Sequence, residues 1–134
     1  YNSGGHRKIT PDEYETIKKY LQKFPESMHI RAAFIIASEA IYSPSAEYKR
    51  VPDKIINKAK QWSEQYPKKI EFQEAYFGLL FSRLKYAQAQ DMRNEQRRVY
   101  REMKTVAERA NYSEYNESNQ LMESVDILHR VFGY

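Results

Sequence analysis

Two aromatic-proline pairs recur at a fixed distance in this 134-residue chain: Phe24-Pro25 and Tyr66-Pro67 stand 42 positions apart. At both places an amphipathic stretch ends at the aromatic residue and a long, strongly apolar stretch follows the proline. Proline removes a backbone donor and clashes with the preceding helical turn, so each pair separates two helices. A helical unit that recurs at a fixed period is typical of repeat arrays, in which neighbouring units share one continuous core.

The composition indicates a single ordered domain, with 41% apolar and 30% charged residues and only four glycines. The absence of cysteine excludes disulfides, thiolate chemistry and Cys-ligated zinc, and it favours a reducing compartment, which we take to be the cytoplasm. No apolar run approaches the roughly 20 residues of a membrane span. The chain begins at Tyr1 without an initiator Met. We therefore expect a flexible segment at residues 1–10 and a domain at residues 11–134, cut from a longer protein.

Helix caps and apolar periodicity predict six helices. Thr10-Pro11-Asp12-Glu13 combines an N-cap hydroxyl, proline at the first helical position and an acidic third residue, so a helix is expected over residues 11–24. The next two are expected over residues 27–42 and 52–66. A fourth begins after Pro67 and ends in a polar turn near residues 88–93, a fifth follows to Ala110, and a sixth covers residues 121–132.

These junctions resemble tetratricopeptide-type repeats over about residues 11–132. The family repeats every ~34 residues, whereas the period here is 42 to 44, and Phe34 and Tyr76 stand where the family has glycine. The resemblance implies an all-α fold, an α-solenoid of about six antiparallel helices in a right-handed superhelix. It also implies that the helices after Pro25, Pro67 and Asn111 line a groove that accepts a peptide or a partner helix.

Most positions aligned with the inward-facing residues of the family are apolar, so a clamp for a terminal carboxylate is not expected. The leading hypothesis is a non-catalytic scaffold that binds a protein or peptide partner. The candidate partner-binding residues are Arg31, Ile35, Glu39, Gln73, Phe77 and Phe81.

A run of basic residues on the fifth predicted helix supports an alternative, nucleic-acid or anionic-partner binding. Positions 93, 97, 101 and 104 share one helical face, although Glu95 and Glu102 interrupt the run. A solvated helix surface is the commoner explanation of such a run, and the whole chain carries only +4. We call this run the basic ridge; it comprises Arg93, Arg97, Arg98, Arg101 and Lys104.

No group of residues demands a particular chemistry. His6, His29 and His129 form no chelating pair, and no glycine-rich loop precedes a helix after a strand. We therefore expect no catalysis, no cofactor and no metal. A helical enzyme or small-molecule sensor is the third hypothesis, and it would need a polar cluster inside an apolar cavity. The residues eligible for that cluster are Arg31, Glu39, Glu74 and Arg83.

Overall fold

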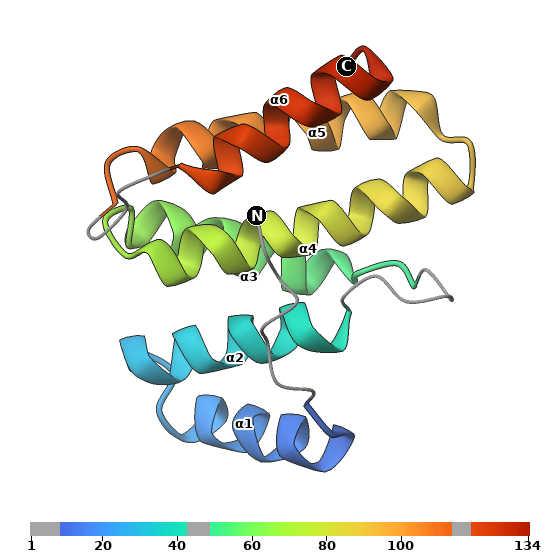
Figure 1. Cartoon of the computed structure of the whole chain (residues 1–134). Helices are drawn as coiled ribbons and strands as arrows, with labels where there is room; N and C mark the ends of the chain where they lie inside the picture. Colours follow the sequence, from blue (N-terminus) through green and yellow to red (C-terminus); the bar gives the residue numbers. More distant parts are fainter. Residues whose placement is uncertain (1–8, 43–48, 114–118) are drawn as a thin grey trace.

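The computed structural model describes residues 9–42, 49–113 and 119–134, and within these ranges it contains helices and no strands. This confirms the all-α prediction and all six predicted helices (Figure 1). Most of the expected N-terminal segment, residues 1–8, lies outside the described residues. The helices are α1 (Pro11–Lys23), α2 (Met28–Ile41), α3 (Asp53–Gln65), α4 (Ile70–Ala89), α5 (Arg93–Ala110) and α6 (Gln120–Phe132).

The helix starts and breaks occur where local chemistry predicts them. Thr10 and Glu13 form the expected capping box, each side chain accepting from the other's backbone N–H. At the first break the N–H of Phe24 donates to a carbonyl one turn earlier, and at the second the N–H of Tyr66 does the same, both at 2.8 Å. The chain then leaves the helical path, because the proline that follows has no N–H to continue the ladder.

Two other helices, α4 and α6, end at residues with positive φ. Asp91, with φ of 54°, lies between α4 and α5, and Met92 donates across the turn to the carbonyl of Ala87 at 2.8 Å. This is the left-handed C-terminal arrangement that satisfies the last carbonyls of a helix. Gly133, with φ of 72°, ends α6 in the same conformation.

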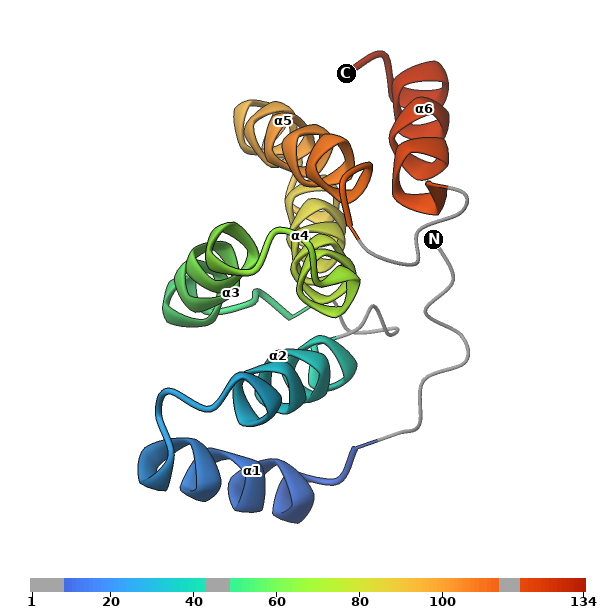
Figure 2. The ribbon, with the colours of Figure 1, turned by 90° about the vertical axis from the view of Figure 1, so that its left-hand side faces the viewer.

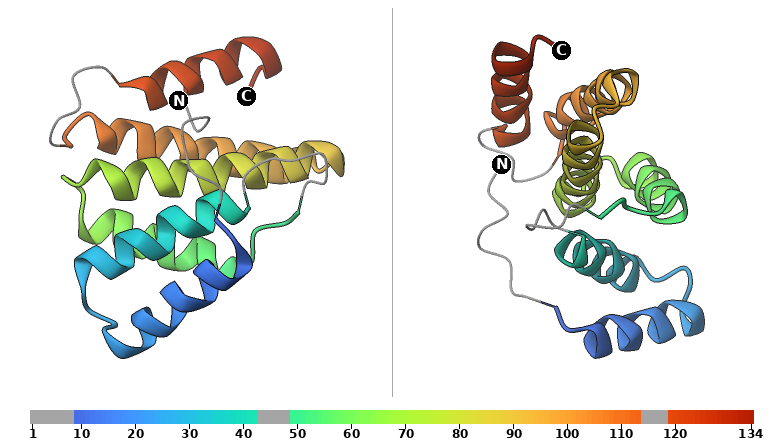
Figure 3. Two further views of the ribbon diagram at one scale, coloured as in Figure 1. Left: turned by 60° about the horizontal axis from the view of Figure 1, so that its bottom comes forward. Right: turned by 90° about the vertical axis from the view of Figure 1, so that its right-hand side faces the viewer.

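Helix α4 is the centre of the stack, with α2, α3 and α5 packed against it, while α1 packs on α2 and α6 packs on α5 (Figures 2 and 3). This arrangement explains why α4 has little polar surface, as its sequence predicted. It contributes the largest fully buried side chains, including Phe72, Tyr76, Phe77, Leu79 and Leu84. Helices α1 and α6 lie at opposite ends of the stack. Over the described ranges, none of the helices has the length and apolar character needed to cross a membrane.

Candidate functional site

A cleft of about 610 Å³ is lined by residues of α1 and α3 and by Phe34 of α2. Figure 2 shows the order of these three helices, with α2 between α1 and α3. The walls of the cleft come from two helices that are far apart in the sequence, and its floor is a row of aromatic rings. Tyr14 stacks on Phe34, with ring centroids 5.7 Å apart, and Phe34 meets the edge of Trp62 at 6.2 Å. Such pairs add to the energy of burial and hold the rings in fixed orientations, so the floor is rigid.

The floor is held in place by a hydrogen bond between α1 and α2. The hydroxyls of Tyr14 and Ser38 lie 2.6 Å apart, and the Ser38 hydroxyl also lies 2.8 Å from the carbonyl of Phe34. Since Ser38 has one proton and gives it to that carbonyl, Tyr14 is the donor in the first bond. Burial raises the pKa of Tyr14, against the opposing effect of the Ser38 hydrogen bond.

Three lysines form the rim of the cleft: Lys18 on α1, and Lys54 and Lys58 on α3. The ammonium group of Lys18 lies 4.6 Å from the centre of the Tyr14 ring, and that of Lys58 lies 5.4 Å from the centre of the Phe34 ring. Lys18 also pairs with Glu15 at 3.0 Å, and the hydrogen bond to Glu15 raises the pKa of Lys18.

Lys54 and Lys58 have no acidic partner within the described part of the chain. Burial lowers the pKa of Lys58, and the positive charge of Lys54 lowers it further. Both causes disfavour the charged form of Lys58, so an anion placed between these two lysines would relieve the unfavourable electrostatics. Sequence reasoning did not select these lysines; their only signal was a spacing of four residues on one helix.

The six predicted partner-binding residues lie on α2 and α4, two helices that pack directly against each other. Ile35, Gln73 and Phe77 have no exposed surface and Glu39 is 3% exposed. A partner would reach these four only if the helices packed around them moved apart. The other two, Arg31 and Phe81, are half-buried.

Arg31 and Gln73 have structural hydrogen bonds in this fold. The Arg31 guanidinium donates to the carbonyl of Pro25 at 2.7 Å and to Gln65 and Tyr66 at 3.1 Å, which ties α2 to the end of α3. The Gln73 amide donates to backbone carbonyls near the end of α3, among them that of Ser63 at 3.1 Å. These hydrogen bonds hold the helices together and are not directed toward a partner.

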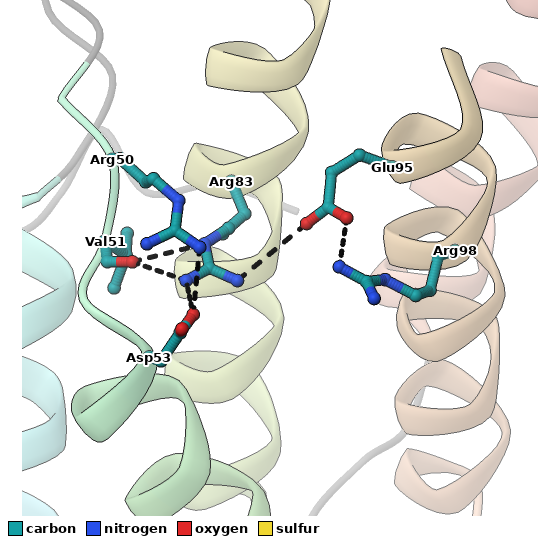
Figure 4. A network of polar contacts seen from close by, with 6 residues as sticks. All are labelled: Arg50, Val51, Asp53, Arg83, Glu95 and Arg98. Carbon is teal, nitrogen blue, oxygen red and sulfur yellow. Dashed lines mark hydrogen bonds and ion pairs between the residues drawn. The ribbon is translucent and has the colours of Figure 1, made fainter. Parts of the chain in front are cut away.

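The most deeply buried charged group of α4 is Arg83, which is 7% exposed (Figure 4). Its Nε and Nη2 atoms donate to the carbonyl of Val51 at 3.1 and 2.8 Å, and Nη2 also forms an ion pair with Asp53. On its other side, Nη1 lies 3.9 Å from Glu95, which pairs in turn with Arg98. The hydrogen bond from Arg83 and its charge lower the pKa of Asp53. The network connects the start of α3 with α4 and α5.

All five residues of the basic ridge are exposed along α5. Both acids that interrupt the ridge in the sequence have partners, since Glu95 pairs with Arg83 of α4 and with Arg98 of the ridge itself, and Glu102 accepts from the Tyr76 hydroxyl at 2.8 Å. Along the described residues, no group of three His, Asp or Glu side chains could hold a metal ion.

Comparison with known proteins adds no relative, since no protein-family model, no curated protein and no solved structure matches the chain.

Proposed function

We propose that the protein is a non-catalytic scaffold of the cytoplasm that binds a segment of a protein partner. The six helices are proposed to form a short α-solenoid of antiparallel helices that resembles tetratricopeptide-type arrays. Two observations support this proposal: α2 and α4, which follow the two aromatic-proline breaks, pack side by side, and the helices are added successively along one stack. Stacks of this kind present extended surfaces and rarely carry catalytic groups of their own.

The cleft between α1 and α3 is the proposed binding site, and its lining carries the proposal. An apolar or aromatic side chain of the partner would lie on the floor formed by Phe34 and Trp62. Acidic residues beside it would meet Lys54 and Lys58, which have no ion pair with any described residue. A volume of about 610 Å³ falls within the ~300–1,000 Å³ of typical binding pockets.

Two lysines cover the floor in the unbound protein, in which Phe34 is 4% exposed. An ammonium group above an aromatic ring is held by about 0.5–1 kcal/mol at an exposed site. A carboxylate of the ligand offers a full charge, so Lys18 and Lys58 would turn toward it and uncover the rings. The ligand would then gain both the ion pairs and the apolar contact, which explains a preference for acidic and apolar residues in one segment.

The experiment is a selection from a displayed library of random peptides on the intact protein. We expect enrichment of peptides in which an apolar or aromatic residue has Asp or Glu within two positions. Selected peptides should bind the variant Lys54→Gln/Lys58→Gln about 2- to 30-fold more weakly, since each of the two exposed ion pairs contributes about 0.2–1 kcal/mol. The matched control is Lys60→Gln, which removes an exposed charge of α3 outside the cleft. Enrichment of basic peptides, or equal binding to the double variant, would overturn the proposal.

A further inference from the structure

The two acids that interrupt the basic ridge in the sequence offset only one of its five cations in the fold. Glu95 is 15% exposed and paired with Arg83 and Arg98, while Glu102 accepts a hydrogen bond from Tyr76. Arg98 is thereby neutralised. The remaining four cations keep the shared face, and Arg97, Arg101 and Lys104 have no ion pair with any described residue.

The spacing of this face suits a chain of repeated negative charges. Arg93, Arg97 and Arg101 follow one another at intervals of four residues, so successive guanidinium groups are about 6 Å apart along the helix axis at ~1.5 Å per residue. Guanidinium groups bind phosphate through paired N–H donors and stack on flat rings, which lysine does not do as well.

A second hollow, of about 400 Å³, adjoins the ridge where α5 begins. Arg93 and Arg97 form one wall, and Phe132 and Tyr134 from the C-terminal end form another. Phe132 is 47% exposed, although it is a large apolar residue, and its ring stacks on Tyr134 with centroids 5.4 Å apart and planes 22° apart. A flat ring that is open on one side and supported on the other is a stacking platform. Asp91 also borders the hollow. Its carboxylate lies 3.9 Å from the guanidinium of Arg93, so it offsets the positive charge of Arg93 in part.

The platform is fixed from below by hydrogen bonds. The Tyr134 hydroxyl donates to Gln96 at 2.7 Å and accepts from Gln88 at 3.0 Å, and the Tyr134 ring packs on Tyr100 at 5.4 Å. These contacts join the C-terminal turn to both α4 and α5. The aromatic face therefore stays at a constant position relative to the arginines of the ridge.

We propose that the basic ridge and this hollow form a binding site for single-stranded nucleic acid. One base stacks on the open face of Phe132, and its neighbouring phosphates bind Arg93 and Arg97. The strand then follows α5, with the next phosphates at Arg101 and Lys104. A combination of aromatic platforms and a cationic track is the usual basis for binding single strands without sequence preference. A duplex fits less well, because its base faces are already stacked.

The test is a fluorescence anisotropy titration of the full chain with a labelled 10-nucleotide single strand at several salt concentrations. Phe132→Ala should weaken binding by about tenfold, whereas Phe132→Trp, which keeps a flat ring, should bind as tightly as the parent. Arg97→Gln/Arg101→Gln should also weaken binding and should reduce the slope of log affinity against log salt by about 1.4, or ~0.7 for each phosphate that is no longer neutralised. Circular dichroism confirms that each variant is folded.

The matched control is Lys19→Gln/Lys60→Gln, which removes two exposed charges from α1 and α3 and should change the affinity less than twofold. A duplex of the same sequence and a poly-glutamate peptide identify other anionic ligands. Three results would each overturn the proposal: no dependence on Phe132, an equal loss of affinity in the control variant, or binding of the duplex or the peptide as tight as that of the single strand.

Discussion

Replacement of the buried Arg83 by Met gives a direct test of how the stack is held together. The methionine chain preserves most of the apolar stem and removes the guanidinium, together with its hydrogen bonds to Val51. Val51 has no exposed surface, so its carbonyl would lose both partners without gaining water. An unsatisfied buried acceptor costs about 1–3 kcal/mol.

Two further effects modify this magnitude and partly cancel. Glu95 would lose a cation at 3.9 Å, which adds to the destabilisation. Removal of the guanidinium also relieves the desolvation of a buried charge, which acts in the opposite direction. The ion pair with Asp53 contributes little, because that carboxylate is largely exposed. We expect a net loss of about 2–3 kcal/mol, and a fall in Tm of roughly 6–12 °C for a domain of this size.

The assay is urea unfolding followed by far-UV circular dichroism and by the fluorescence of Trp62, the only tryptophan. The control Arg101→Met removes an exposed arginine of α5 and should alter the free energy of unfolding by less than about 0.5 kcal/mol. Asp53→Asn should have a much smaller effect than Arg83→Met. If the Met variant matched the Arg101 control, or if Asp53→Asn were equally damaging, the hydrogen bonds to the carbonyl would not be the source of the stabilisation.

The remaining predictions concern single groups. Burial, reinforced by the hydrogen bond to Glu102, raises the pKa of Tyr76. Above pH ~10 the unfolded chain therefore releases a tyrosine proton that the folded protein keeps. The contribution of Tyr76 to the free energy of unfolding is fully present below pH ~10 and falls above it. Tyr76→Phe should flatten that fall in unfolding measurements, and an unchanged slope would contradict it. The pKa of Lys58, lowered by burial and by Lys54, should rise toward its ordinary value in Lys54→Gln when methylated lysines are titrated by NMR; no movement would exclude coupling between the two. Asp91, with φ of 54°, should tolerate glycine with a gain of about 0.5 kcal/mol in thermal unfolding, because glycine adopts positive φ without strain; a loss of stability would show that the Asp side chain itself stabilises the turn.

The helices of this fold were predictable because their signals are local. Thr10 and Glu13 cap α1 through atoms three residues apart, and the prolines end α1 and α3 by removing a donor from the adjacent turn. The strongly apolar sequence of α4 agrees with its central position, where α2, α3 and α5 pack against it. The identity of those helices depends on contacts between distant segments, which periodicity does not encode.

The candidate site was harder to predict for the same reason. Ile35 and Phe77 are apolar residues on apolar helices. The sequence pattern of such residues does not distinguish an open groove from a contact with a neighbouring helix. The structure places them between α2 and α4, with no exposed surface. In the sequence, Lys54 and Lys58 have the pattern of ordinary surface charges. They become the rim of a cleft only because α1 packs on the other side of α2, and the sequence does not show that contact. The pairing of Arg83 with a carbonyl 32 residues earlier likewise has no sequence signal.

The Arg83 network also bears on whether the two proposed sites influence each other. It joins the start of α3, the helix that carries Lys54 and Lys58, to Glu95 on α5, the helix of the basic ridge. Position between two sites does not by itself produce coupling, which needs an element with two alternative arrangements. The hydrogen bonds and ion pairs of Arg83 are satisfied in a single arrangement, so we expect a rigid connection and independent binding. Under conditions where Arg83→Met is fully folded, its affinities for an acidic peptide and for a single strand should lie within twofold of the parent values. A tenfold change in either affinity, or competition between the two ligands, would instead show that the network transmits a conformational change between the cleft and the ridge.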